Sequence, residues 1–200
     1  MIDFECFSDY EGLIFDMDGT VIDTMPSHKS AWDKVGESLG YPIDGQMLYE
    51  LGGASVREIA KVMMQKAAMP MSLFDDVIRL KRQYGIELIM QHSSLLPTFD
   101  VVRYFSDKKP LALGTGSHQA IVNLLLTKFD LYSYFDAIVT ADDVEKHKPA
   151  PDTFLRCAEL LHVNPKNCLV FEDADLGIKA GLAAGMDVFD VRINQLVKGK

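Results

Sequence analysis

The chain has 200 residues, of which 48% are hydrophobic and 24% are charged, and its net charge is −9 at pH 7. This composition can build a full hydrophobic core, in one large domain or in a core with a smaller partner domain. The negative charge disfavours sequence-independent binding to nucleic acid or to an anionic membrane. The N-terminus has no basic region followed by a long apolar run, and no apolar stretch approaches a membrane span. The three cysteines lack metal-site spacing and indicate free thiols, so we expect a cytoplasmic protein.

The first expected strand ends at two carboxylates. Residues 13–15 form a short apolar run, which is typical of a strand buried on both faces in a parallel sheet. Asp16 and Asp18 follow it, at the strand end where chemistry takes place in open α/β sheets. Two anions this close need a shared proton or a hard cation such as Mg²⁺. Alternatively, one carboxylate attacks phosphorus while the other moves the proton.

Two other interpretations of this stretch need no catalysis. In the first, it is a metal-free turn in which Asp18 caps and Gly19 supplies a positive φ. In the second, it opens an EF-hand loop, but the twelfth position of that loop is Ser27 instead of Glu and a buried strand precedes it. The EF-hand interpretation is therefore disfavoured.

Residues 24–92 are predicted to be almost wholly helical. A first helix begins at Pro26 and ends at Gly40. Ser55 then has the sequence of an N-cap, with Glu58 three residues later completing a capping box. A longer helix is expected over about 72–91. An all-helical insertion after the first strand is typical of a lid over a catalytic site.

From Pro97 onward, expected helices alternate with expected strands, which predicts a parallel sheet with right-handed crossovers. We interpret Asp175 as the N-cap of one of these helices. The predicted fold is α/β, with a Rossmann-like core of residues 1–22 and 93–200 and a small helical cap of residues 23–92. The predicted strands are 111–114, 137–139, 168–171 and 187–191, and the predicted helices are 98–107, 117–128, 152–162 and 175–184.

Polar residues follow three of these strands or lie on a nearby loop. Thr115 and Gly116 precede a helix, where a hydroxyl and bare N–H groups can hold an anion. Lys148 lies in a loop stiffened by prolines, and Glu172 and Asp173 form a second acidic pair. Each feature alone has an ordinary structural explanation, such as a capping turn or a solvated lysine.

The order of these features resembles the four motifs of the haloacid dehalogenase superfamily, and the helical insert resembles its type-one cap. The stretches 148–152 (Lys-Pro-Ala-Pro-Asp) and 172–180 (Glu-Asp-Ala-x-x-Gly-Ile-x-Ala) are similar to the β-phosphoglucomutase-like branch of sugar-phosphate phosphatases and mutases. Within that branch the chain resembles the short bacterial fructose-1-phosphate phosphatases. The motif residues are Asp16 and Asp18, Thr115, Lys148, and Glu172 with Asp173.

The resemblance implies a mechanism. Asp16 would attack the phosphoryl group and become an aspartyl-phosphate. Asp18 would protonate the leaving alcohol and then deprotonate the hydrolytic water. The resemblance further implies Mg²⁺ on Asp16, Asp18 (through its backbone carbonyl), Asp173 and the nearby Glu172, and phosphoryl oxygens on Thr115, the Gly116 N–H and Lys148.

The implied substrate is a small-molecule phosphate ester, with fructose 1-phosphate as the first candidate. We expect the protein to be a monomer. His28, Arg57 and Lys81 are the candidate substrate residues of the cap. Arg57 lies one position later than the mutase arginine, and Thr20 stands where mutases tend to have Val, so both favour hydrolysis. A phosphosugar mutase stays the alternative, and a non-catalytic phosphate-binding domain of the same fold is a third interpretation.

Overall fold

The computed structural model describes residues 4–51 and 54–199. Six strands form the main sheet, in the order β5-β4-β1-β6-β7-β8. β1 (Gly12–Phe15) lies between β4 (Leu111–Gly114) and β6 (Cys168–Glu172) and is parallel to both. Beyond them, β5 (Ala137–Val139) and β7 (Asp187–Asp190) are also parallel, and β8 (Gln195–Val197) is antiparallel at one edge.

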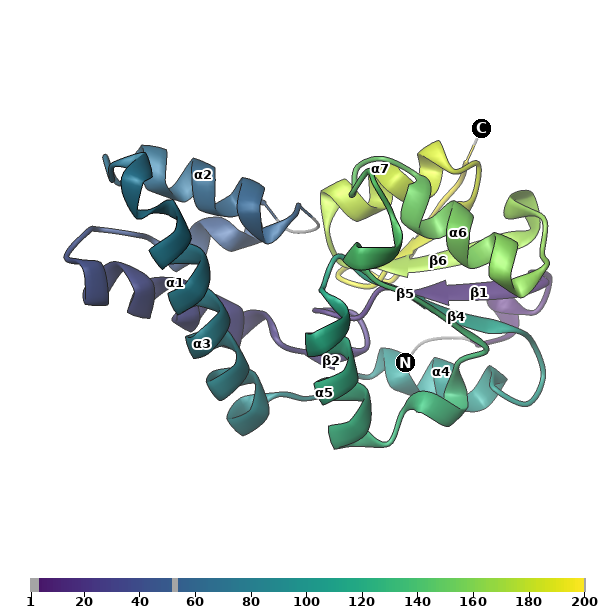
Figure 1. The fold of residues 1–200 in the computed structure, drawn as a ribbon. Coiled ribbons are helices and arrows are strands. Elements are labelled where there is room, and N and C mark those ends of the chain that lie inside the picture. The colour runs from purple at the N-terminus through teal and green to yellow at the C-terminus, as the bar shows by residue number, and fades with distance from the viewer. Residues whose placement is uncertain (1–3, 52–53, 200) are drawn as a thin grey trace.

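The central strands are buried on both faces, as the apolar runs predicted. All residues of β1, β4 and β6 are buried. One face of the sheet packs against α4 (Thr98–Phe105), α5 (Gln119–Phe129) and the 3₁₀ turn η1 (Phe4–Phe7). The other face packs against α6 (Asp152–Leu161) and α7 (Asp175–Ala183), as Figure 1 shows. The strands are thus fixed by apolar side chains above and below, and only their ends are free to carry polar groups.

The helices inserted after β1 pack around a hydrophobic cluster of their own. α1 (Met25–Leu39), α2 (Val56–Lys66) and α3 (Phe74–His92) lie to one side of the main sheet (Figure 1). Within the described part of residues 30–90, no strand joins that sheet. The predicted capping box of Ser55 and Glu58 opens α2. The predicted fold class, an α/β core with a helical cap, is confirmed, whereas the boundaries at 23 and 92 stay a prediction.

Two chain segments connect the cap to the core. They are β2 (Ile22–Asp23) and β3 (Ser94–Leu95), which pair antiparallel in a small second sheet. Lys128 of α5 lies beside this junction and donates hydrogen bonds to the carbonyl oxygens of Met90 (3.0 Å), in the last turn of α3, and Ser93 (3.2 Å), its C-cap. These bonds satisfy carbonyls that the end of a helix leaves without partners.

Three features differ from the sequence prediction. The pair β2–β3 and the strand β8 were not expected, because runs of two or three residues with little hydrophobic alternation give no strand pattern. The interpretation of Asp175 as an N-cap is wrong. Ala174 is the N-cap of α7, and Asp175 is its first residue and pairs with Arg192 at 2.9 Å.

Short 3₁₀ turns complete the described chain. They are η2 (Gly45–Tyr49), η3 (Met71–Leu73), η4 (Tyr132–Tyr134), η5 (Ala141–Asp143) and η6 (Pro165–Asn167). Between residues 4 and 199, with 52 and 53 set aside, no helix has both the length and the apolar character needed to cross a membrane.

Candidate active site

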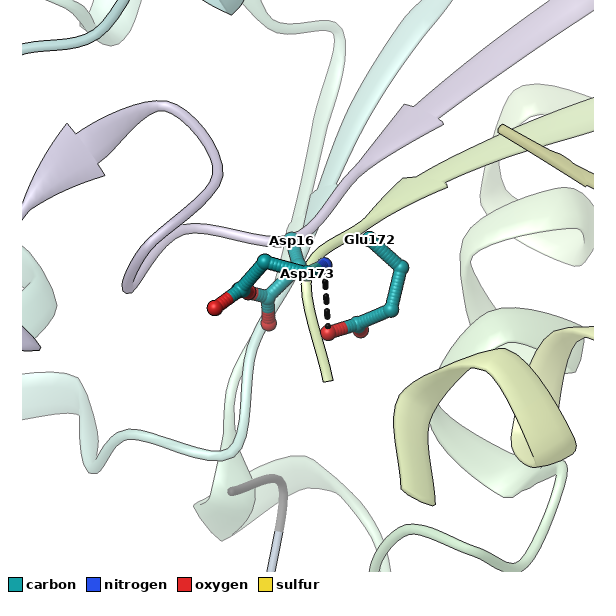
Figure 2. A group of neighbouring side chains, drawn as sticks. All are labelled: Asp16, Glu172 and Asp173. Atoms are coloured by element: carbon teal, nitrogen blue, oxygen red, sulfur yellow. Dashed lines mark hydrogen bonds between the residues drawn. The ribbon is translucent and has the colours of Figure 1, made fainter. Parts of the chain in front are cut away.

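The carboxyl ends of the central strands bring the predicted acidic residues together. Asp16 follows β1 directly, Glu172 is the last residue of β6, and Asp173 follows it (Figure 2). One oxygen from each of these carboxylates lies within 4.8 Å of the others. Glu172 is held in place because its Oε1 accepts hydrogen bonds from the backbone N–H groups of Asp173 (3.2 Å) and Ala174 (3.1 Å). The parallel register therefore builds an acidic cluster from residues far apart in sequence.

Lys148 pairs with two of these carboxylates. Its Nζ donates to Asp16 Oδ1 at 2.6 Å and to Glu172 Oε2 at 2.8 Å, and it lies 4.6 Å from the centre of the Phe154 ring. Burial alone would lower the pKa of Lys148, but the two carboxylates raise it above its ordinary value. The ammonium is therefore a fixed positive charge inside the cluster.

One ammonium does not balance the cluster. Burial, with the charge of Glu172 next, raises the pKa of Asp16 to about 8. Burial, with the charge of Asp16 next, raises the pKa of Asp173 to about 7. The protein thus holds several buried carboxylates against a single lysine, and in the absence of another cation Asp16 and Asp173 keep their protons to a higher pH than an ordinary carboxyl does.

Asp18 has a different environment. Its Oδ1 accepts a hydrogen bond from Thr24 Oγ1 at 2.6 Å, and its Oδ2 accepts one from Ser117 Oγ at 2.7 Å. His28 Nε2 lies 3.4 Å from Oδ1. Burial acts to raise the pKa of Asp18, but these donors, with His28 the strongest, lower it to about 2. Asp16 and Asp18 therefore line the same cavity, but the pKa of Asp16 is raised and that of Asp18 is lowered.

Two glycines make room for the acidic side chains. Gly19 has φ +89°, and a Cβ there would lie 2.2 Å from Asp173 Oδ2. A Cβ at Gly177, in the first turn of α7, would lie 2.0 Å from Glu172 Oε2. Thr20 follows Gly19 and donates from its hydroxyl to Asp173 Oδ1 at 3.0 Å. The glycines of both acidic motifs are therefore steric requirements of the cluster.

The residues of the cluster suit a hard divalent cation. Carboxylate oxygens are the ligands that Mg²⁺ prefers, and three carboxylates of the cluster here face a single ammonium. Asp16, Glu172 and Asp173 could hold such an ion. The Asp18 carboxylate is engaged by Thr24 and Ser117 instead, so only its backbone carbonyl would be available from that residue.

The loop after β4 forms a polar wall of the same cavity. Thr115, Gly116 and Ser117 all line it. Thr115 Oγ1 accepts a hydrogen bond from Ser117 N at 3.0 Å, which tightens the turn before α5. Lys148 is not among the cavity-lining residues of the described chain, because Asp16 and Glu172 cover its ammonium. The structure thus brings Thr115 and Gly116 to the cavity surface and places Lys148 behind it.

The cap closes the cavity, whose volume is about 500 Å³. His28, Arg57 and Lys81, the candidate substrate residues of the cap, all line it. Lys81 is buried, and its Nζ lies 3.0 Å from His28 Nδ1 and 5.5 Å from the centre of the Trp32 ring. Burial lowers the pKa of Lys81 to about 8. Arg57 is exposed and lies 4.9 Å over the Phe74 ring.

Lys81, His28 and Asp18 form a chain from the cap to the core. Burial, and next the charge of Lys81, lowers the pKa of His28. A neutral His28 accepts from Lys81 at Nδ1 and presents its Nε2–H toward Asp18. The cap therefore contacts the acid/base candidate directly.

Sequence reasoning missed two site features. Thr24 has the sequence of a helix N-cap, but its hydroxyl bonds to Asp18 and caps nothing. Asp142 lines the cavity from η5 and lies 2.7 Å from His118, a contact between residues 24 apart that no local pattern could show.

Comparison with known proteins agrees with this geometry. A family model described as "Haloacid dehalogenase-like hydrolase" matches residues 13–191, which include every residue of the acidic cluster. The chain belongs to the haloacid dehalogenase-like hydrolase family. The expected resemblance to this superfamily is therefore confirmed.

Within this family, the similar proteins include enzymes named for phosphorylated sugars. The chain is 44% identical to the fructose-1-phosphate phosphatase YqaB of Escherichia coli over 184 residues, 92% of this chain and 97% of the relative. It is 32% identical to a phosphorylated carbohydrates phosphatase of Thermotoga maritima over 193 residues, 95% of this chain and 88% of the relative. The crystal structure of a β-phosphoglucomutase from Clostridium difficile aligns with a TM-score of 0.77 at 29% identity, covering 90% of this chain and 84% of that one.

Proposed function

We propose that this hydrolase removes phosphate from small sugar phosphates, with fructose 1-phosphate as the first candidate substrate. The observation that carries the proposal is that Asp16 and Asp18 line one cavity in different surroundings. Asp16 lies beside the Lys148 ammonium, whereas Asp18 accepts hydrogen bonds from hydroxyl groups. The relatives named as a fructose-1-phosphate phosphatase and a phosphorylated carbohydrates phosphatase support the substrate class.

Asp16 is the proposed nucleophile. Lys148 holds its Oδ1, so the carboxylate is oriented and its negative charge is stabilised when the phosphoryl group arrives. A bond forms between an Asp16 oxygen and phosphorus as the bond to the sugar oxygen breaks, which gives an aspartyl-phosphate. Water then attacks phosphorus and releases inorganic phosphate, and Asp16 is regenerated.

Asp18 is the proposed acid and base. It gives its proton to the departing sugar oxygen and later takes one from the attacking water. Its low pKa suits the second role as the structure stands. For the first role, an incoming phosphate dianion raises its proton affinity, because like charges oppose ionisation. His28, which lies between Asp18 and Lys81, orients this carboxylate from the cap side.

Three groups surround the proposed position of the phosphoryl group. Thr115 and the Gly116 N–H line the cavity and would bind its oxygens, while Lys148 contributes its charge from behind Asp16. Mg²⁺, held by Asp16, Asp173, Glu172 and the Asp18 carbonyl, would neutralise the negative charge shared by the carboxylates and the substrate when bound. We further propose that residues 23–92 act as the cap and that the enzyme is monomeric and cytoplasmic, with no nucleic-acid or membrane partner.

The phosphatase is tested with purified protein, Mg²⁺ and two esters, fructose 1-phosphate and β-glucose 1-phosphate. We expect inorganic phosphate from the ketose ester and none in excess chelator. Rapid conversion of the second ester to glucose 6-phosphate, with little free phosphate from either, would instead indicate a mutase like the β-phosphoglucomutase whose structure aligns with this one.

The nucleophile is tested by Asp16→Asn, with Asp9→Asn as a control on an exposed carboxylate. An amide cannot form the acyl-phosphate, so we expect turnover to vanish while binding of fructose 1-phosphate survives. Turnover within about tenfold of wild type, a barrier change of only ~1.4 kcal/mol, would show that Asp16 is not the nucleophile.

A further inference from the structure

The start of α5 forms part of the cavity wall, and what we infer from it rests on the proposed function. α5 begins at Gln119, directly after the loop that carries Thr115 and Gly116. The N-terminus of a helix has free N–H groups and a partial positive charge, and a nearby histidine adds to its attraction for anions. Here that position would suit a second phosphate of a sugar bisphosphate.

The protein fills this position with an anion of its own. Asp142 in η5 accepts a hydrogen bond from Gln119 N at 2.9 Å through Oδ2, and its Oδ1 lies 2.7 Å from His118 Nδ1. His118, the N-cap residue of α5, makes no side-chain capping bond of its own. Both oxygens of the carboxylate are thus placed on the groups that would otherwise attract a ligand's anion.

The position of Asp142 is fixed by its own segment. Ala141 N donates to the carbonyl of Ser117 at 3.0 Å, which ties η5 to the loop after β4. Thr140 Oγ1 accepts from Asp142 N at 3.2 Å. Asp142, His118 and Ser117 all line the cavity, so this segment borders the space that the substrate would occupy.

We propose that Asp142 is a specificity-determining residue that selects sugar monophosphates and excludes sugars carrying a second phosphate. Its charge repels another anion, and its occupation of the α5 N-terminus removes the donors that such an anion needs. A neutral sugar hydroxyl is compatible with the same carboxylate, because it can donate to it. The cap contributes cations to the cavity, Arg57 and Arg82, so total charge alone does not produce this selectivity.

The test measures kcat/KM for fructose 1-phosphate and for fructose 1,6-bisphosphate in wild type and in Asp142→Asn. The amide keeps an acceptor for Gln119 N and loses the charge. We expect the ratio of the two kcat/KM values to move toward the bisphosphate by about tenfold, a modest change because the Asp142 carboxylate is half exposed to solvent. Asp142→Ser, which keeps a small acceptor, should move the ratio in the same direction and serves if the amide variant does not fold.

Controls separate specificity from helix capping. Asp142→Glu keeps the charge and should retain the wild-type ratio. Glu145→Gln removes the same charge from an exposed residue three positions along and should also leave the ratio unchanged. Because the Asp142 side chain is 50% exposed, added salt should weaken the discrimination in wild type but not in Asp142→Asn. A purely structural role would lower activity on both esters together.

The possible outcomes distinguish the two proposals. An active wild type whose Asp142→Asn and Asp142→Ser variants keep the original ratio would overturn this inference and leave the proposed function standing. A wild type that hydrolyses neither ester would overturn the proposed function and this inference with it.

Discussion

Replacing Lys148 should destabilise the protein, and the loss should depend on pH. The change Lys148→Met keeps most of the volume of the side chain and removes its charge. It leaves Asp16 and Glu172 buried without the ammonium that lies 2.6 and 2.8 Å from them. Removing one partner of a buried ion pair costs about 3–5 kcal/mol of unfolding free energy. For a chain of this size that corresponds to a fall in Tm of about 6–20 °C.

The pH dependence follows from the direction of the carboxylate shifts. The pKa of Asp16 is already raised to about 8 in the folded protein, and burial also raises that of Glu172. An acid with a raised pKa binds more protons in the folded state, so its ionisation makes the fold less stable as pH rises. Without Lys148 both pKa values rise further, because the ammonium was lowering them. The destabilisation by Lys148→Met should therefore be larger at about pH 8 than at about pH 5.

The assay is urea or thermal unfolding in chelator at both pH values, so that no added metal replaces the lost charge. Lys146→Met is the matched control, because Lys146 is exposed two residues earlier in the same loop. The unfolding free energy of this control should lie within about 0.5 kcal/mol of the wild-type value. A Lys148→Met protein that is as stable as this control at about pH 8 would refute the argument that the ammonium compensates the buried carboxylates.

Three further predictions address the cluster and the cap. Gly19→Ala should lower the unfolding free energy by ~1–3 kcal/mol and abolish phosphate release, because its Cβ would lie 2.2 Å from Asp173. The control is Gly40→Ala, which is also at positive φ but has open space around it. This variant should lower Tm without abolishing phosphate release. In chelator, the Tm of the wild type should fall between about pH 5 and about pH 8 as Asp16 and Asp173 ionise. Mg²⁺ should make this dependence of Tm on pH weaker. An equal dependence with and without Mg²⁺ would contradict a metal on these carboxylates. Lys81→Met should raise the KM for fructose 1-phosphate. In the wild type, KM should increase at pH values above about 8, where this lysine loses its proton. The variant should show no such increase.

Several site features were readable from sequence because each depends on a short stretch of chain. The apolar run 13–15 predicted a strand buried on both faces, and that strand is central in the sheet. Ser55 and Glu58 predicted a capping box through a spacing of three, and the box is present. The exposed or two-residue strands gave no such pattern, so β8 and the pair β2–β3 were missed.

The partners of the site residues were decided by tertiary structure. Lys148 contacts Asp16 across 132 positions in the chain, and Ser117 contacts Asp18 across 99. Nothing in the sequence states that one aspartate lies beside an ammonium and the other beneath hydroxyls, although this difference gives them pKa values of about 8 and about 2.

Sequence by itself determined the fold class and pointed to the candidate reactive side chains, since hydrophobic periodicity and short motifs are local properties of the chain. Tertiary structure alone decided the proton affinity of each carboxylate and the shape of the cavity. Both depend on burial and on charges a few ångströms away, and those distances arise only when parallel strands place their ends side by side. The position of Asp142 on the first N–H of α5 is one such result of folding.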